Sequence, residues 1–523
     1  MAPPIRRRLL LVLLLPVLAV AALPAAAAAA SCRAWLVQSI PTDMPHLRRV
    51  PGVLSTADVL QWLSGNATKN LDILAQYWQL IAQPKNPKSG DYGFSESDMA
   101  RFGADQGLRV YKALENAADR KEVTFKHCVV AEAGFAWIVQ HSGFAPEFDQ
   151  ESADLAAGRP NVQNATLLFE DWWGSGVLHA KVWISDKKDL YIGSANNDWK
   201  SLTQVKELGI YFASCPQIAK TVEVYFQNLW TLSTLNSTTY TKVALDKQWQ
   251  TSRKVPCWSH FLQPKDRCRS PLPLSVDVPY VDGYPSLANP KLLDVLIETP
   301  GLKSFNKEHY FSYLSFAPPE LSFDKFQADE QGWVDTIKSV NSEGMVRINT
   351  MDWLGQSQYA PQTVFWPSLS SAISEVIISK NATVRILVAY WTHFIPNTEN
   401  YLKSLLYSNI LCVSSKYNHC GGKVEIRYYV VPGYNSTGPA LSQGDATGNH
   451  YPDFTRVNHG KYAVSDTRAN IGTSNLIWDY FYTTAGVSFG TYDPSIVSQL
   501  QDVFDADWDS PYTVPVKPLQ ASV

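Results

Sequence analysis

A short motif that occurs twice in the chain constrains its fold more than any other feature. Each copy has the form His-x-Lys-x-x-x-x-Asp and is followed, a few residues later, by Gly-Ser/Thr-x-Asn. The first copy comprises His179, Lys181, Asp186, Ser194 and Asn196, and the second comprises His459, Lys461, Asp466, Thr473 and Asn475. A chance match at corresponding places in two halves is very improbable, so we expect two similar halves.

Both halves alternate strand-like apolar runs with helix-like stretches, which is the pattern of an α/β fold. In the first half we expect strands at residues 71–80, 123–130, 165–169, 177–184 and 190–192, and a helix at 96–117. In the second half we expect strands at 346–351, 384–390, 424–431 and 461–464, and helices at 366–379 and 399–406. The sequence therefore predicts two pseudo-twofold-related lobes, each a mixed β-sheet flanked by helices, with one shared active site at their interface.

The length of 523 residues exceeds the size at which a single core stops growing, which fits two core-forming units. We assign residues 31–255 to the first lobe and 291–512 to the second. Residues 256–290, rich in Pro, Lys and Arg, are expected to be a linker, and 513–523 a tail that is disordered or lies on the surface.

Residues 1–30 have the features of a secretory signal peptide, because three arginines precede an apolar run that ends in an alanine tract. The run is also long enough to span a bilayer, so an uncleaved signal anchor is the alternative. Prolines in the run and its Ala-x-Ala sites favour cleavage. No second run of this length follows, so we expect no membrane span in the mature chain unless this segment is retained. A signal peptide sends the chain into the secretory pathway, so we expect the protein in the lysosomal or vacuolar lumen or outside the cell.

Glycosylation sequons and cysteines also support passage through the secretory pathway. Five Asn-x-Ser/Thr sequons, as in a glycosylated secretory protein, stand at Asn66, Asn164, Asn236, Asn381 and Asn435. Seven cysteines allow three disulfides with one thiol left over: Cys32, Cys128, Cys215, Cys257, Cys268, Cys412 and Cys420. The short spacings of Cys257 with Cys268 and of Cys412 with Cys420 suggest local loops. A zinc site is the alternative, but the chain has no Cys-x-x-Cys pair.

The spacing within each motif points to one pocket. Residues i and i+2 share a face of a strand, so His179 and Lys181 should project together, as should His459 and Lys461. Two such sets facing each other would bring together two imidazoles, two ammonium groups and several neutral donors. Such a pocket suits a phosphodiester.

The chemistry of this pocket follows from its groups. One neutral imidazole would attack phosphorus to form a phosphohistidine, while the other, protonated, would donate to the leaving oxygen and later activate water. The lysine, asparagine and hydroxyl donors would stabilise the phosphate oxygens, so neither a metal nor a cofactor is required. The motif aspartates would orient or brace the histidines and the other groups of the pocket. The remaining histidines, including His127, His141 and His309, lack this context and should be structural or surface residues.

The paired motif resembles that of the phospholipase D superfamily. The chain is more narrowly similar to the lysosomal branch formed by phospholipase D family members three and four. The likeness extends over residues 32–512 and includes the segments 193–209, 365–367, 471–481 and 507–512. All six His, Lys and Asp positions are intact, which argues against a binding module that has lost its activity.

The resemblance implies roles for individual residues. His179 would be the nucleophile and His459 the general acid. The phosphate would lie on Lys181, Lys461, Ser194, Asn196, Thr473 and Asn475. Glu207, eleven positions beyond Asn196, would contact the opposing histidine, whereas Gly486 stands at the equivalent place in the second copy, so the site should be asymmetric. The resemblance also implies a disulfide between Cys32 and Cys215.

The substrate is less constrained than the reaction. The resemblance implies 5′-3′ degradation of single-stranded DNA and RNA, with phospholipase D or transphosphatidylase activity on phospholipids as the alternative. The net charge of −3 provides no overall basic field for duplex binding. The pairs Tyr77-Trp78, Trp172-Trp173 and Tyr390-Trp391 could stack on unpaired bases, although a place in the core is the commoner role. The oligomeric state is left open, a homodimer included.

Overall fold

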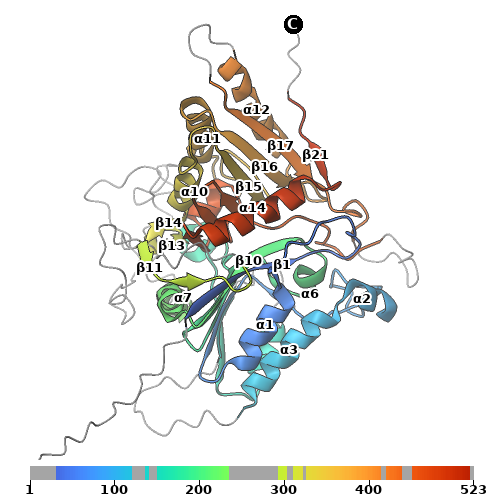
Figure 1. Cartoon of the computed structure of the whole chain (residues 1–523). Coiled ribbons are helices and arrows are strands. Elements are labelled where there is room, and N and C mark those ends of the chain that lie inside the picture. Colours follow the sequence, from blue (N-terminus) through green and yellow to red (C-terminus); the bar gives the residue numbers. More distant parts are fainter. Residues whose placement is uncertain are drawn as a thin grey trace, which may run out of the picture. The chain divides into compact units, whose positions relative to one another are not determined.

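The computed structural model describes residues 31–120, 136–140, 150–234, 292–302, 310–321, 326–413, 420–438 and 450–518. In this part of the chain there are two mixed β-sheets flanked by helices, which confirms the predicted fold class (Figure 1). The first sheet consists of β1 (Cys32–Ser39), β2 (Leu54–Ser55), β3 (Leu71–Ala75), β5 (Ala136–Gln140), β6 (Val162–Thr166), β7 (Val182–Ser185), β8 (Asp189–Gly193), β10 (Glu207–Ala213) and β12 (Ile297–Glu298).

The second sheet is built from the C-terminal half. It consists of β11 (Leu292–Asp294), β13 (Phe311–Ala317), β14 (Gln327–Ala328), β15 (Met345–Thr350), β16 (Thr383–Ala389), β17 (Lys423–Tyr429), β18 (Tyr462–Val464), β19 (Ala469–Gly472), β20 (Gly486–Thr491) and β21 (Thr513–Pro515). A separate small pair joins β4 (Trp78–Gln79) to β9 (Asn197–Asp198).

The two sheets repeat one topology. The path β1-β10-β8-β7-β3-β5-β6 in the first corresponds to β13-β20-β19-β18-β15-β16-β17 in the second. In both paths the first four pairings are antiparallel and the last two are parallel. The internal repeat of the motif is therefore an internal repeat of the fold.

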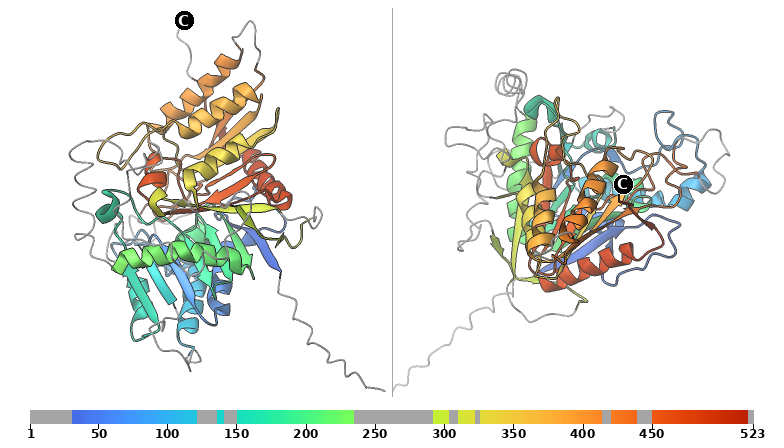
Figure 2. Two further views of the ribbon diagram at one scale, coloured as in Figure 1. Left: turned by 90° about the vertical axis from the view of Figure 1, so that its left-hand side faces the viewer. Right: turned by 90° about the horizontal axis from the view of Figure 1, so that it is seen from above.

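Helices cover the sheets in equivalent places. In the first lobe α1 (Thr56–Asn66) and α3 (Asp105–Ala118) lie side by side, and α1 contacts β7 (Figure 1). In the second lobe α10 (Asp329–Lys338), α11 (Ser368–Ser379) and α12 (Thr398–Val413) pack in sequence, with α12 against β17 (Figure 2). The long helices α7 (Pro216–Thr234) and α14 (Pro494–Trp508) follow β10 and β20. Shorter helical segments are α2 (Glu96–Phe102), α4 (Gln150–Ala156), α5 (Glu170–Trp173), α6 (Trp199–Thr203), α13 (Trp478–Tyr482) and the 3-10 turn η4 (Pro319–Leu321).

The helix expected at residues 96–117 is broken in two. Gly103 follows α2 with a φ of +74°, a left-handed conformation that ends helices and favours glycine. In α3, Val110, Tyr111, Leu114 and Ala117 are buried at helical spacing, so one face of this helix packs on the core.

A hydrophobic cluster shared by the two lobes lies between the cores that each lobe has of its own. Residues from both sheets belong to a single buried hydrophobic cluster. At its centre Phe212 of β10 meets Phe489 of β20 edge to face, with ring centroids 4.7 Å apart. Tyr225 of α7 stacks on Phe316 of β13 at the same distance. The lobes are thus joined by apolar packing as well as by the chain.

Several predicted boundaries are wrong. The strand expected at 177–184 begins only at Val182, because residues 177–179 pair with the other lobe. The strand expected at 71–80 divides into β3 and β4, and that at 165–169 lies at β6 instead. Residues 513–515, expected to begin the tail, form β21 and pair with β17. β12 pairs with β1 of the first lobe, although residues 291–512 were assigned to the second. The expected strand at 123–130 and linker at 256–290 lie outside the described residues.

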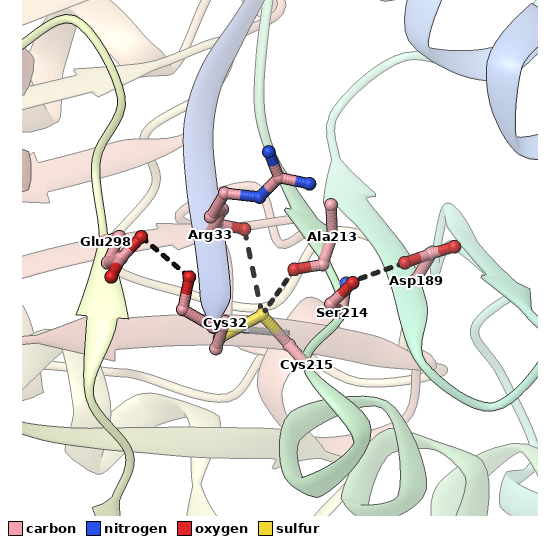
Figure 3. The surroundings of a disulfide bond; sticks show 8 residues. Cys32, Arg33, Asp189, Ala213, Ser214, Cys215 and Glu298 are labelled. Atoms are coloured by element: carbon pink, nitrogen blue, oxygen red, sulfur yellow. Dashed lines mark hydrogen bonds between the residues drawn. A yellow bond between two sulfur atoms is a disulfide. The ribbon is translucent and has the colours of Figure 1, made fainter. Parts of the chain in front are cut away.

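Two disulfides cross-link the described chain. Cys32 at the start of β1 is bonded to Cys215, just after β10, as the resemblance implied (Figure 3). The neighbouring Ser214 donates its N–H to Asp189 at 2.7 Å, which fixes the same corner of the sheet. Cys412 is bonded to Cys420 beyond α12. These disulfides indicate an oxidising environment such as the secretory pathway. Cys128, Cys257 and Cys268 lie outside the described residues.

Four of the five sequon residues lie in the part of the chain that the structure describes. The sequon residues Asn66, Asn164, Asn381 and Asn435 are exposed, whereas Asn236 lies outside the described residues. Among the residues that the structure describes, no helix is long and apolar enough to cross a bilayer. Residues 1–30, whose cleavage or retention decides the anchor question, are not among them.

Candidate active site

Each motif histidine lies where its own lobe pairs with the other one. The residue before it forms a β-bridge across the interface: Leu178 pairs with Ala485, and Asn458 with Lys206. The N–H of His179 donates to the carbonyl of Ala485 at 3.2 Å, and that of His459 to Lys206 at 2.7 Å. The histidines therefore stand on extended segments that enter β7 and β18, not on the strands themselves. Cross-lobe pairing brings the two motifs together.

One cavity receives both histidines. Its volume is about 520 Å³, and the two imidazole centroids are 6.3 Å apart. Both side chains are buried. Polar residues that also line the cavity include Gln76, Tyr77, Asn196, Lys200, Glu207, Asp352 and Asn475. A phosphate group with its substituents fits a space of this size between the two rings.

His179 is prepared to act as a neutral base or nucleophile. Its Nδ1 lies 2.9 Å from the carbonyl oxygen of Thr473. A carbonyl only accepts hydrogen bonds, so Nδ1 carries the proton and Nε2 of the neutral ring holds a free lone pair. Burial lowers the pKa of His179 well below its ordinary value, and the charges of Lys181 and Lys461 lower it further.

His459 has a different partner. Its Nδ1 lies 2.9 Å from both carboxylate oxygens of Glu207, which comes from β10 of the other lobe. Burial lowers the pKa of His459 to about 4, and the Glu207 carboxylate opposes this shift by stabilising the imidazolium. An anionic phosphate in the cavity would oppose it too. Of the two rings, His459 is the one built to hold a proton.

Glu207 remains ionised in this setting. Burial raises the pKa of its carboxyl, but His459 and Lys461 outweigh burial, and the net pKa lies below its ordinary value. Gly486 occupies the corresponding place after the second motif. A side-chain carbon there would come within 2.5 Å of the hydroxyl of Ser474, so the second lobe has no room for a matching carboxylate without rearrangement.

The two motif lysines lie directly behind the histidines. The ammonium of Lys181 donates to the carbonyl of His179 at 2.7 Å, and that of Lys461 to the carbonyl of His459 at 2.5 Å. Lys181 also donates to Gln76 at 3.1 Å. Burial lowers the pKa of both, well below the ordinary value for Lys181 and to about 7 for Lys461. Their positive charges make the cavity favourable for an anion.

The two motif asparagines face the cavity from corresponding places. Asn196 donates to the hydroxyl of Tyr77 at 3.4 Å, and Asn475 donates to the carboxylate of Asp352 at 2.8 Å. Tyr77 follows β3 and Asp352 follows β15 at equivalent positions. A hydroxyl in one lobe is thus matched by a carboxyl in the other.

Asp352 is unusual in a site for phosphate. It lines the cavity, and burial raises the pKa of its carboxyl to about 6, although the charge of Lys461 opposes the shift. The carboxyl is therefore neutral below about pH 6 and charged at neutral pH. Nothing in the motif pattern had pointed to it.

The motif aspartates were predicted to brace the histidines, and this prediction is wrong. Asp186 lies beyond the far end of β7, in the turn to β8, and accepts N–H groups of residues 68–70 at 2.7 to 3.2 Å. Asp466 likewise follows β18 and accepts the N–H groups of Asn341 and Met345 at 3.2 Å. Strands three or four residues long separate them from the lysines that precede β7 and β18. Both aspartates hold the loops that lead into β3 and β15.

Ser194 and Thr473 were expected on the phosphate, yet both are enclosed by backbone. The hydroxyl of Ser194 accepts the N–H of Leu208, and that of Thr473 accepts the N–H of Val487, both at 3.0 Å. Both side chains are fully buried and do not line the cavity. Each hydroxyl instead pins a motif loop to the neighbouring strand.

An apolar wall completes the cavity. Tyr480 packs its ring edge to face against His179, with centroids 4.9 Å apart, and Tyr359 lies beside Tyr480. Trp391, His393 and Phe454 also line the cavity. His393 was expected to be structural or a surface residue, but it lines the site. Of the aromatic pairs singled out in the sequence, Trp78, Trp172 and Trp173 belong to the core, whereas Tyr77 and Trp391 reach the cavity.

Comparisons with known proteins agree with this geometry. Residues 149–254 match a family model described as "PLD3/4, PLD-like domain". A probable phospholipase D of Caenorhabditis elegans is 30% identical over 488 residues, which cover 92% of this chain and 70% of that protein. The chain belongs to the phospholipase D family. As such a protein, it is a phosphodiesterase, either an exonuclease or a phospholipase D.

Two further relatives show how widely the phospholipase D likeness extends. Phospholipase D Z of Dictyostelium discoideum is 28% identical over 489 residues, covering 93% of this chain and 92% of that protein. The 5′-3′ exonuclease PLD3 of Xenopus laevis is 28% identical over 495 residues, covering 92% and 81%. Both likenesses extend over more than nine-tenths of this chain.

Proposed function

We propose that this phospholipase D family member is a 5′-3′ exonuclease that degrades single-stranded DNA and RNA in the lysosomal or vacuolar lumen, or outside the cell, through a phosphohistidine. One observation carries the reaction: His179 and His459 face one cavity, but only His459 has a carboxylate partner. This asymmetry assigns one ring to attack and the other to proton transfer.

The first step uses the two rings in opposite states. Nε2 of neutral His179 attacks phosphorus, and the P–N bond forms as the bond to the leaving oxygen breaks. The protonated Nε2 of His459 gives its proton to that oxygen, so the leaving chain departs as an alcohol. Glu207 stabilises the imidazolium before transfer and keeps the ring oriented through Nδ1.

The second step reverses the proton movement. Neutral His459 removes a proton from water, the water oxygen attacks phosphorus, and the P–N bond breaks to release His179 as a neutral ring. Asn196 and Asn475 line the cavity and supply donors for the equatorial oxygens in both steps, and Lys181 and Lys461, buried behind the histidines, supply positive charge. This scheme uses no metal ion, so activity should persist in excess EDTA.

The proposed nucleic-acid substrate rests on two observations. The matched family model and the Xenopus relative both carry the PLD3 description. The cavity also combines an anion site with several aromatic side chains in its lining, which is the combination that single-strand binders use. Bases of a duplex are stacked on one another and offer no free face to such a lining.

Phospholipid is the second candidate. Relatives named phospholipase D match this chain over nearly its whole length, and an apolar cavity wall could also contact acyl or glycerol carbons. The chemistry at phosphorus would be the same, with an alcohol replacing water in transphosphatidylation.

A paired assay separates the two candidates. Single-stranded oligonucleotides labelled at the 5′ or the 3′ end are incubated with the glycosylated protein at pH 5, beside phosphatidylcholine vesicles. We expect stepwise loss from the 5′ end, abolished in His179→Ala and His459→Ala and retained in His46→Ala, whose histidine is exposed on a loop outside the site. Lipid turnover without oligonucleotide shortening would overturn the exonuclease proposal.

A further inference from the structure

Phe454 has an unusual backbone conformation at the mouth of the cavity. Its φ is +56°, in the left-handed region that is unfavourable for a bulky residue, and its side chain is 54% exposed. The ring nevertheless lines the cavity that holds His179 and His459. An exposed phenyl ring in a strained conformation gains little from burial.

The internal repeat shows what the backbone alone would require here. Gly174 stands at the corresponding place before the first motif, five residues ahead of His179, with a φ of +74°. Glycine adopts this conformation without penalty. Since the same local path is made with glycine in one lobe, the side chain of Phe454 is not needed to form the turn.

A nearby residue shows how such strain is normally offset. Arg456 also has a positive φ, +58°, where the first lobe has Gly176. Its buried guanidinium donates to the carbonyls of Pro432 and Thr42 and so joins the two lobes. Packing explains the arginine, whereas the exposed ring of Phe454 has no comparable set of contacts.

Phe454 is instead held against a second ring. The imidazole of His393 stacks on it with centroids 4.8 Å apart and an interplanar angle of 16°. One carboxylate oxygen of Asp453 accepts the N–H of Phe454 at 2.9 Å and lies 3.4 Å from Nε2 of His393, so the same group orients both rings. Trp391 packs edge to face on His393 and backs the stack.

We infer that Phe454, supported by His393, is a stacking platform for the unpaired base of a nucleotide adjoining the scissile phosphate. This inference rests on the proposed exonuclease function and names a contact that the function leaves open. One face of the phenyl ring is covered by His393, and the ring is still half exposed, so a flat base can continue the stack. Aromatic rings hold bases of any sequence in this way. An acyl chain has no planar face to match.

The test combines removal of the Phe454 ring with removal of the base, in the manner of a double-mutant cycle. We would measure kcat/KM of wild type, Phe454→Ala, Phe454→Leu and Phe454→Trp on a single-stranded oligonucleotide and on the same strand with an abasic residue next to the scissile phosphate. Tyr407→Ala is the matched control, because Tyr407 is also 54% exposed but lies on α12 outside the cavity.

We expect Phe454→Ala and Phe454→Leu to lose about 5- to 150-fold on the intact strand, the factor equivalent to the ~1–3 kcal/mol of one stacked base. Phe454→Trp and Tyr407→Ala should stay near wild type. On the abasic strand the difference between wild type and Phe454→Ala should disappear. A Leu variant as active as wild type, or an equal loss on both strands, would contradict stacking.

A binding measurement gives a readout independent of turnover. With 2-aminopurine at the flanking position and the inactive His179→Ala protein, stacking should quench the fluorescence, and adding Phe454→Ala should abolish the quenching. Unchanged quenching would overturn the platform. If the wild-type enzyme leaves oligonucleotides intact, both the proposed function and the platform are overturned. If wild type and Phe454→Ala shorten oligonucleotides equally fast, only the platform is overturned.

Discussion

Glu207 accepts a hydrogen bond from Nδ1 of His459 at 2.9 Å across the boundary between the two lobes. The corresponding nitrogen of His179 meets only the carbonyl of Thr473. A pseudo-symmetric pair of motifs thus gives two chemically unequal histidines.

Replacing Glu207 with Gln should impair proton donation. Without the carboxylate, the pKa of His459 falls further, so less of the ring is protonated at any given pH. We expect kcat/KM to drop by about 10²–10⁴, the usual contribution of a general acid, and its optimum to move to lower pH. Glu375→Gln on the exposed face of α11 serves as the control. A rate within about twofold of wild type, with an unmoved pH profile, would contradict the role of Glu207.

Asp352 should make substrate binding depend on pH. Its pKa is raised to about 6 by burial, so the carboxyl is neutral below this pH and repels the phosphodiester above it. KM of the wild type should rise as the pH passes from 5 to 7.5. Asp352→Asn keeps an acceptor for Asn475 without the charge, so its KM at pH 7.5 should be lower than that of wild type by about tenfold, one pKa unit of interaction. Parallel KM profiles for the two proteins would exclude this explanation.

Asp72 should make the fold more stable in acid than at neutral pH. Burial, and then the charge of Glu223, raises its pKa to about 8, above the ordinary value of an unfolded chain. The folded protein therefore keeps a proton that the unfolded chain releases, and this contribution to stability is complete below about pH 4 and declines as the pH rises toward 8. Asp72→Asn, which cannot ionise, should have a Tm higher than wild type at pH 7.5 by at least ~2 °C, and a Tm close to it at pH 4.5. A variant with the lower Tm at pH 7.5 would refute the sign.

The two disulfides should differ in their effect on stability. The bond between Cys32 and Cys215 closes a loop with a sequence separation of 183, whereas that between Cys412 and Cys420 closes one of 8. A longer loop removes more entropy from the unfolded chain, so Cys32→Ser/Cys215→Ser should cost about 3–5 kcal/mol and the short-loop double variant about 2–3. Denaturant unfolding of the two double variants tests the order. A larger loss from the short loop would contradict it.

Much of this arrangement is readable in the sequence because the fold repeats. The double motif predicted two lobes and one shared cavity, and the family resemblance, applied at the position eleven residues beyond Asn196, implied the contact of Glu207 with His459. The spacing within each motif is local to one segment of the chain, so the sequence displays it directly.

Other features depend on what the fold brings together from distant places. Asp186 and Asp466 look catalytic beside a histidine and lysine, but a short strand carries them to the opposite end of the sheet, where they bind loop N–H groups. Asp352 and His393 have no motif around them, and only the packing of their loops places them on the cavity wall. The chemical character of these residues could be predicted from the sequence, whereas the part of the fold that each side chain contacts could not.

The most direct test of the central claim is to locate the covalent intermediate. Wild-type enzyme and a His459→Ala variant, in which hydrolysis of the intermediate should slow, would be mixed with substrate, quenched and digested, and the phosphorylated peptide sequenced by mass spectrometry under conditions that preserve phosphohistidine. We predict a nucleotide attached through its phosphate to His179. An adduct on His459 in the wild type, or turnover with no adduct on either ring, would contradict the mechanism.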